Sequence, residues 1–352
     1  MIDVLAVLFF LLIIWNIKPV DPLRDIFSDY LSVSNGKAWR GIFTVLVLFH
    51  HLSQRTESGQ IFRVFEQAGI IGVSLFFFYS GYGLMKRHTT TTAYHRGFIK
   101  KRLPSIYVPY WTATIIVLLI NALFGYYFTP EVVLLALIGI KPVVMHAWFI
   151  TVLLMFYCIF WLLMLLFRNH YWLMVTGATM WWGGWIWLCT ELDYGLWWYN
   201  TAHMLIIGMI WALVGDKVVS SLPINVLWVF PVAGYLITAI RIRENGDLLV
   251  PISYGSLTWA QLTTVFFILS WLFFMMKLRV GNQIARYLGG IAIEVYLAQG
   301  IFQTWLRSDY LYIDSDFYYA VACTLGAIGV GALLNIVNTH ILVAYRKKFH
   351  VS

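Results

Sequence analysis

Charged residues are scarce in this sequence. They make up 11% of its 352 residues, and only 16 are Asp or Glu. Soluble domains carry about one quarter charged residues. With 61% hydrophobic residues and a mean hydropathy of +0.77, the chain is too apolar for one water-soluble core. The shortage of charge therefore excludes an ordinary soluble protein and indicates a chain whose main solvent is lipid.

Cysteines and linker segments are also few. The three cysteines, Cys158, Cys189 and Cys323, are odd in number, lie in apolar segments and have no metal-ligand spacing. They exclude a disulfide framework, and we predict no metal site. The sequence has no Gly/Ser-rich or Pro-rich linker and no repeat with a clear period, so a single membrane domain is expected. The absence of N-x-[ST] sequons and the short loops favour a bacterial source.

What the sequence has in quantity is apolar runs of membrane-spanning length. They predict an all-α, polytopic transmembrane bundle of about eleven spans, in a multi-pass protein of the cell membrane. The aromatic residues, 18% of the chain with 17 Trp, suit interfacial belts and pocket linings. The runs are residues 2–17, 39–54, 69–85, 105–125, 147–167, 171–190, 198–214, 222–240, 257–276, 287–305 and 318–344.

The basic residues indicate the orientation of these spans. When the loops are assigned to alternate sides, one side holds 18 of the 24 Lys and Arg residues and the other holds six. By the positive-inside rule the richer side is cytoplasmic, which predicts an outer N-terminus and a cytoplasmic C-terminus. This placement accounts for the net charge of +8 without a nucleic-acid partner.

Both ends of the chain and one loop also carry predictions. Residues 1–36 are expected to form an N-terminal helix, retained because it lacks a basic leader and a cleavage site, and a connector. Within this region residues 18–38 have mixed charge typical of an amphipathic surface helix. Residues 126–146 have room for a short re-entrant or interfacial helix, and residues 346–352 form a basic cytoplasmic tail.

Few ionisable residues lie inside the predicted spans, and each is a candidate functional residue because its burial in lipid is costly. They are His50, His51, His203, Glu294 and His340.

The stretch Trp39–Arg55, WRGIFTVLVLFHHLSQR, places an arginine below a histidine pair. His51 follows Arg40 by eleven residues, which is about three helical turns and roughly 16 Å, so both lie on nearly the same helix face. An anion held by Arg40 could extend a long arm toward His51, as coenzyme A would, and a neutral His51 could act as a general base. The alternative interpretation is structural: Arg40 lies at the membrane interface, and His50 and His51 form hydrogen bonds with a neighbouring helix.

Two further stretches carry both a functional and a structural interpretation. Ser80-Gly81-x-Gly83 offers small residues for close helix packing. The loop that follows, which includes Arg87, Lys101 and Arg102, suits either a cytoplasmic phosphate site or contact with anionic lipid.

The remaining candidates lie later in the chain. Glu294 is the only carboxylate in any span, so it is expected to orient His51 or to form a structural hydrogen bond. The stretch from His146, HAWFITVLLMFY, is interpreted chiefly as an interfacial tryptophan belt.

Taken together, these stretches resemble the acyltransferase 3 family of integral membrane acyltransferases. Arg40-Gly41-x8-His50-His51 is similar to its R-x10-H motif, LFFFYSGYGL (75–84) to its F-F-x-x-S-G segment, and FIKKRLPSIYVPYW to its basic loop. HAWFITVLLMFY resembles its L-W-F-x-x-x-L-x-x-Y block. IEVYLAQ resembles its I-Y-L-x-H close, although Gln299 stands where a histidine is common. The likeness covers residues 37–345, with residues 1–36 as an addition to the usual ten helices.

The resemblance implies transfer of an acyl group, usually acetyl, from cytoplasmic acyl-CoA to a hydroxyl of a cell-envelope glycan or lipid-linked sugar. His51 would be the catalytic base, with His50 and Glu294 as further catalytic candidates. Arg40, Arg87, Lys101, Arg102 and Ser80 would bind acyl-CoA, and a separate extracytoplasmic transferase is an expected partner. Two alternatives remain: a secondary transporter, against which the lack of paired helix breaks counts, and a non-catalytic sensing module.

Overall fold

The fold is almost wholly helical. The computed structural model describes residues 1–20, 26–244 and 254–349. Within them lie fourteen α-helices, two short 3-10 helices and one two-stranded sheet. The α-helices are α1 (Asp3–Ile14), α2 (Val33–Ser53), α3 (Gly69–Thr90), α4 (Phe98–Arg102), α5 (Pro104–Leu123), α6 (Pro130–Leu137), α7 (Trp148–Phe167), α8 (Tyr171–Glu191), α9 (Met204–Ser221), α10 (Ile224–Glu244), α11 (Tyr254–Lys277), α12 (Gln283–Gly290), α13 (Ala292–Trp305) and α14 (Asp316–Lys348). The 3-10 helices are η1 (Phe62–Gln67) and η2 (Leu196–Trp198), and the strands are β1 (Ile17–Pro19) and β2 (Leu278–Val280).

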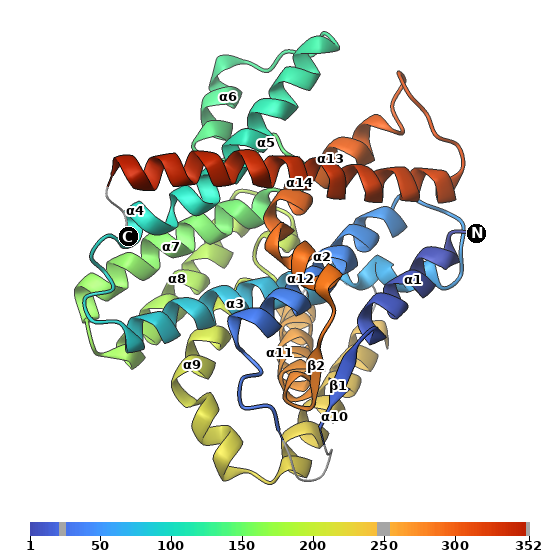
Figure 1. Cartoon of the computed structure of the whole chain (residues 1–352). Helices are drawn as coiled ribbons and strands as arrows, with labels where there is room; N and C mark the ends of the chain where they lie inside the picture. Colours follow the sequence, from blue (N-terminus) through green and yellow to red (C-terminus); the bar gives the residue numbers. More distant parts are fainter. Residues whose placement is uncertain (21–25, 245–253, 350–352) are drawn as a thin grey trace.

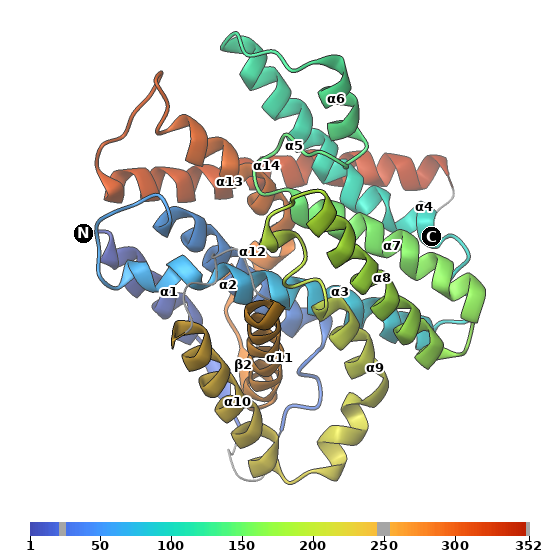
Figure 2. The same ribbon diagram turned by 180° about the vertical axis from the view of Figure 1, so that it is seen from behind.

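The helices surround a central pair, α2 and α3. In Figure 1 α14 crosses the near face, and Figure 2 shows α8, α10 and α11 on the opposite face. The start of α1 and the last turn of α14 lie on opposite sides of the molecule (Figure 1). Thus the longest helix closes one side of the bundle while α2 and α3 run through its middle.

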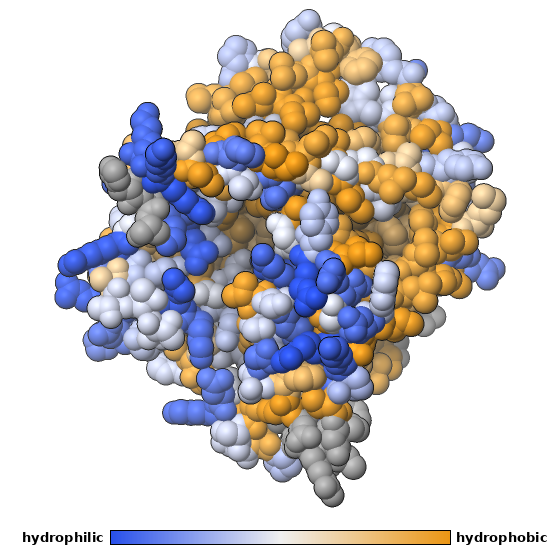
Figure 3. All heavy atoms as spheres, in the orientation of Figure 1, coloured by the Kyte–Doolittle hydropathy of each residue, from blue (hydrophilic) through white to orange (hydrophobic). Residues whose placement is uncertain are grey.

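The all-α class predicted from the apolar runs is confirmed. Each of the eleven apolar runs lies on one or two helices, while the number of crossings and their orientation stay predictions. Apolar side chains cover much of the upper and right-hand surface in Figure 3, whereas polar ones gather at the left, near the end of α14, and across the centre and lower centre of this face. Five helical segments are long and apolar enough to cross a membrane: Phe98–Leu123, Trp148–Phe167, Met204–Ser221, Trp259–Lys277 and Asp316–Lys348.

The prediction of an amphipathic helix over residues 18–38 is wrong for residues 18–20 and 26–32, which are not helical, whereas residues 33–38 are the start of α2. Residues Ile17–Pro19 form β1, which pairs antiparallel with β2, and α2 begins only at Val33. Pro19, which has no backbone N–H for the ladder, is the last residue of this short strand. Residues 21–25 lie outside the described residues. The short helix sought in residues 126–146 is present as α6.

The predicted span 287–305 is broken into α12 and α13 at Ile291. Two glycines, Gly289 and Gly290, precede the break, and glycine is a poor helix former. Gly289 has a packing reason, since a Cβ there would lie 1.8 Å from the carbonyl oxygen of Lys37. The break therefore brings α12 into backbone contact with α2, at the end of α2 that carries Arg40.

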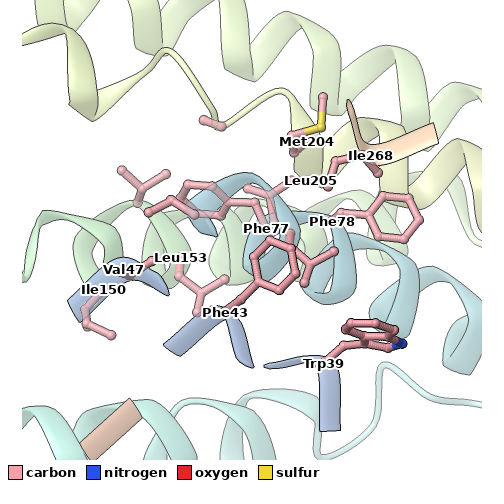
Figure 4. Packing of buried hydrophobic residues seen from close by; sticks show 14 of the residues in the cluster. Trp39, Phe43, Val47, Phe77, Phe78, Ile150, Leu153, Met204, Leu205 and Ile268 are labelled. Carbon is pink, nitrogen blue, oxygen red and sulfur yellow. The ribbon is translucent and has the colours of Figure 1, made fainter. Parts of the chain in front are cut away.

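The core lies where α2, α3, α7, α9 and α11 meet. Figure 4 shows large apolar side chains from all five helices packed together. This cluster fixes the positions of α2 and α3. The labelled members are Trp39, Phe43 and Val47 of α2, Phe77 and Phe78 of α3, Ile150 and Leu153 of α7, Met204 and Leu205 of α9, and Ile268 of α11.

The close approach of α3 to α9 gives a stability prediction. A Cβ on Gly81 would lie 1.8 Å from the carbonyl oxygen of Leu205, so Gly81→Ala forces the two backbones apart. Overpacking of this kind costs about 1–3 kcal/mol. We expect a lower thermal midpoint in detergent for Gly81→Ala. Gly83→Ala is the matched control, because a Cβ there meets nothing within 4 Å; equal midpoints for both variants would contradict the close packing.

Candidate active site

One face of α2 carries the side chains around which the site is built. Arg40, Thr44, Val47 and His51 follow one another at intervals of four, three and four residues, and each lines a cavity. Such intervals keep residues on one side of a helix. The structure thus confirms that Arg40 and His51 share a helix face.

The first cavity, which we call the arginine cavity, has a volume of about 330 Å³. Arg40, Arg102 and Ser80, predicted to bind acyl-CoA, line it, whereas Arg87 and Lys101 are not among its lining residues. Its described lining contains no carboxylate. The wall comprises Arg40, Thr44, Val47, Val73, Phe76, Tyr79, Ser80, Gly83, Leu84, Arg102, Ile106, Phe149, Leu153, Tyr157, Gly289, Gly290, Ala292, Ile293, Val295, Tyr296 and Gln299.

The two arginines of this cavity are held by neutral groups. Arg40 Nε donates to the carbonyl oxygen of Gly36 at 3.3 Å. The hydroxyl of Tyr94 accepts hydrogen bonds from Arg102 Nε at 3.1 Å and Nη2 at 3.0 Å. Neither arginine forms an ion pair with a carboxylate of the described residues. Two cations beside a largely apolar cavity with no counter-charge make a site for an anion.

Gln299 lines the same cavity, and its side-chain amide forms no hydrogen bond with the described residues. The residue is only 1% exposed, and neither Oε1 nor Nε2 finds a hydrogen-bond partner among the described residues. A buried amide in this condition destabilises the fold unless a ligand completes it. Gln299 thus offers one acceptor and two donor hydrogens to a molecule in the arginine cavity.

The second cavity, which we call the histidine cavity, has a volume of about 510 Å³. Both predicted histidines of α2, His50 and His51, line it, as does His146 from the loop before α7. Aromatic and polar side chains complete the wall. Its residues are Val47, His50, His51, Gln54, Glu66, Gln67, Gly69, Ile70, Val73, His146, Trp148, Trp197, Asn200, Thr201 and Tyr296.

The three histidines differ in their partners. His50 Nδ1 lies 3.2 Å from the carbonyl oxygen of Phe65, which ties its ring to η1. The rings of His51 and His146 are stacked, with centroids 3.6 Å apart and planes 15° from parallel. Burial lowers the pKa of His146 to about 4, although its hydrogen bond to Gln303 Oε1 opposes this shift. His146 is therefore neutral near pH 7. Within the described residues no group of His, Cys, Asp or Glu is arranged to hold a metal ion.

Glu294 does not form the predicted pair with His51 in the structure. Its Oε1 accepts hydrogen bonds from Asn335 Nδ2 at 3.2 Å and Asn338 Nδ2 at 3.3 Å, and it lines neither cavity described above. These contacts are with α14, on the side of α13 where that long helix packs. They correspond to the structural alternative, and a catalytic role for Glu294 is left without support from its contacts.

The other histidines of the predicted spans also lie away from the two cavities. His203 is buried, with Nε2 3.1 Å from Thr264 Oγ1 and 3.3 Å from the carbonyl oxygen of Gln261. His340 Nδ1 lies 2.8 Å from the carbonyl oxygen of Ile336 in its own helix. Both have structural partners, so the candidate site narrows to the histidines of α2 and the α7 loop.

The two cavities meet at three residues that line both of them. These residues are Val47, Val73 and Tyr296, and we call them the neck. Val47 lies seven residues after Arg40 and four before His51, which is roughly 10 Å and 6 Å along the helix axis. These three side chains therefore lie between an anion-binding chamber and a histidine chamber.

A family model for an acyltransferase domain, that of acyltransferase 3, matches residues 37–336. The chain belongs to the acyltransferase 3 family. Comparison with curated proteins and with solved structures gave no match. Membership of the acyltransferase 3 family makes the chain a membrane acyltransferase in general terms.

Some residues of this acyltransferase 3 site were not predicted from the sequence. The sequence places His146 at the edge of an aromatic belt and indicates no role for Tyr79, Tyr157 or Gln303. The signal for His146 was present in principle, since a histidine beside Trp148 could line a pocket as well as an interface. What the sequence lacks is any sign that the loop turns back, with His146 at a φ of 65°, to meet α2.

Proposed function

We propose that this protein transfers an acyl group, by preference acetyl, from cytoplasmic acyl-CoA to a hydroxyl of a cell-envelope glycan or lipid-linked sugar. The proposal places it in the plasma membrane as a multi-pass O-acyltransferase. The observation that carries it is the course of α2, which joins a cavity with two arginines and no carboxylate to a cavity with three histidines.

The arginine cavity suits the donor. Arg40 and Arg102 would hold phosphate oxygens of coenzyme A, since guanidinium groups bind phosphate strongly. The apolar wall beyond them would bury the pantetheine arm, and Gln299 would bond to one of its amide groups or to the thioester carbonyl. The thioester would then lie at the neck, next to the turn of α2 that carries His51.

The histidine cavity suits the acceptor and its activation. His51 would accept the proton of the acceptor hydroxyl while the oxygen attacks the thioester carbonyl carbon. A C–O bond forms, the C–S bond breaks, and the proton passes from His51 to the departing thiolate. Trp148, Trp197 and Asn200 in the wall provide flat apolar faces and polar groups, a combination that suits a sugar.

Donor binding by purified protein tests this proposal. The wild type in detergent is expected to bind radiolabelled acetyl-CoA and to transfer the label to water or to a cell-envelope extract. Absence of acetyl-CoA binding would reject the proposal and favour the transporter or sensing alternatives. Binding without any transfer or hydrolysis would reject the catalytic part alone.

Gln299 offers a prediction that links stability to donor binding. Gln299→Leu removes a buried amide with no partner, so the free energy of unfolding should rise by about 1 kcal/mol. The same change should raise the KM for acetyl-CoA by about 3–10-fold, because a hydrogen bond to the donor is lost.

Ser80→Ala is the matched control for Gln299→Leu. Ser80 lines the same cavity, but its hydroxyl already donates to the carbonyl oxygen of Phe76 at 2.9 Å. We expect its KM for acetyl-CoA to stay close to the wild-type value. A Gln299→Leu protein that is more stable and keeps the wild-type KM would show that the amide does not touch the donor.

A further inference from the structure

The imidazole of His51 has no hydrogen-bonded orienter at one of its ring nitrogens. His51 Nδ1 is buried and finds no partner among the described residues, and Glu294 bonds to α14 instead. A base that must meet a substrate proton needs a defined ring plane. The ring has a side-chain hydrogen bond with Gln54, and the contact that limits the tilt of its plane is the stacked ring of His146, 3.6 Å away between centroids.

His146 is itself held at several points. Its Nε2 lies 3.2 Å from Gln303 Oε1, and the Tyr296 hydroxyl donates to its carbonyl oxygen. The carbonyl oxygen of Gln303 in turn accepts from the Tyr319 hydroxyl at 3.0 Å and from Arg55 Nη1 at 3.3 Å. The ring of His146 is thus held at its edge by Gln303 of α13, and its main chain is held by Tyr296 of the same helix.

The surroundings of His146 disfavour a charge on its ring. Gln303 presents a neutral amide, and the guanidinium of Arg55 bonds to the main chain of the same residue. A second positive charge stacked on a protonated His51 would also be repelled. Because its ring stays neutral, His146 contributes a flat face to the site and does not carry the transferred proton.

We propose that His146 is a positioning residue, whose ring, anchored by Gln303, holds the His51 imidazole in one plane so that a ring nitrogen faces the acceptor hydroxyl. This role rests on the proposed function, since it requires His51 to act on an acceptor. In this role His146 replaces Glu294, one candidate that the sequence offers for orienting His51. It acts by ring stacking, where the carboxylate would act by a hydrogen bond.

Two substitutions distinguish the contribution of the His146 ring from that of its hydrogen bond to Gln303. His146→Asn keeps a donor for Gln303 and suits the positive φ of 65°, but it removes the stacked ring. His146→Phe keeps a flat ring and loses the hydrogen bond. The measurement is kcat and KM for acetyl transfer by the purified full-length protein, together with acetyl-CoA binding. Wild type that transfers no acetyl would count against the proposed function, whereas the pattern among variants tests His146.

We expect His146→Asn to lower kcat by about 10²-fold through misplacement of the base, with the KM for acetyl-CoA unchanged. His146→Phe should keep kcat within a few-fold of wild type. A folded His146→Asn protein with wild-type kcat would overturn the proposal. So would a folded His146→Phe protein as inactive as His146→Asn, since that result would require a nitrogen of His146 in the chemistry.

A third variant keeps the test decisive if phenylalanine at positive φ prevents folding. Glycine tolerates that backbone, so His146→Gly leaves a ring-sized space beside His51 that a small added molecule can fill. Recovery of kcat with thiophene, a flat ring without a basic nitrogen, would support the stacking role. Recovery with imidazole alone, or with neither molecule, would overturn it.

Discussion

His51→Ala is expected to lower kcat for acyl transfer by about 10²–10⁴-fold, the contribution typical of a general base. The KM for acetyl-CoA should change little, because His51 lines the histidine cavity and not the arginine cavity. Steady-state kinetics with radiolabelled acetyl-CoA, alongside equilibrium binding of the same donor, would measure both effects on one preparation.

Two other histidines serve as controls for this result. His340→Ala removes an exposed imidazole that bonds only to its own helix, so its activity should equal that of wild type. His50→Ala distinguishes the role of His50 from that of His51. The His50 ring bonds to the carbonyl oxygen of Phe65 and packs against Gly69. We expect only a modest loss of acyl-transfer activity in His50→Ala. If His50→Ala were less active than His51→Ala, the role of general base would be assigned to His50.

Arg40→Met should weaken acetyl-CoA binding by about 10–100-fold, which corresponds to the loss of a charged hydrogen bond worth about 1.5–3 kcal/mol. Arg40 faces a cavity without a carboxylate, so no protein anion is left unpaired when its charge is removed. The loss should appear in the dissociation constant and in the KM for the donor, while the KM for the acceptor stays unchanged.

Arg87→Gln is the control for Arg40→Met. The sequence placed Arg87 among the donor-binding residues, but the structure leaves it out of the cavity wall. If Arg87→Gln binds the donor nearly as well as wild type while Arg40→Met binds it weakly, the donor is bound by arginines that line the cavity. Equal losses in the two variants would mean that a diffuse basic surface attracts the donor instead.

Local spacing explains what could be predicted from the sequence. Arg40 and His51 were found because the 3.6-residue period of one helix fixes which residues share a face. The two adjacent glycines before the break between α12 and α13 are a local signal of the same kind, although the apolar run 287–305 predicts a single helix. Predictions of this kind depend on residues that are neighbours along the chain.

Contacts between distant segments explain what could not be predicted. The partner of Glu294 depends on how α13 crosses α14, and the asparagines that bond it lie more than 40 positions away. His146 reaches His51 only because a loop turns back across the bundle. No period in the sequence encodes either meeting, so neither the contact of Glu294 with α14 nor the stacking of His146 on His51 can be predicted from it.

The neck of Val47, Val73 and Tyr296 has a consequence for steady-state kinetics. Because donor and acceptor would occupy separate chambers, neither would block the entrance of the other. Free coenzyme A should then inhibit competitively against acetyl-CoA and noncompetitively against the acceptor, and the acylated product should show the reverse pattern. A single shared chamber would instead let each product compete with both substrates, so the inhibition patterns alone report whether the two chambers stay separate during turnover.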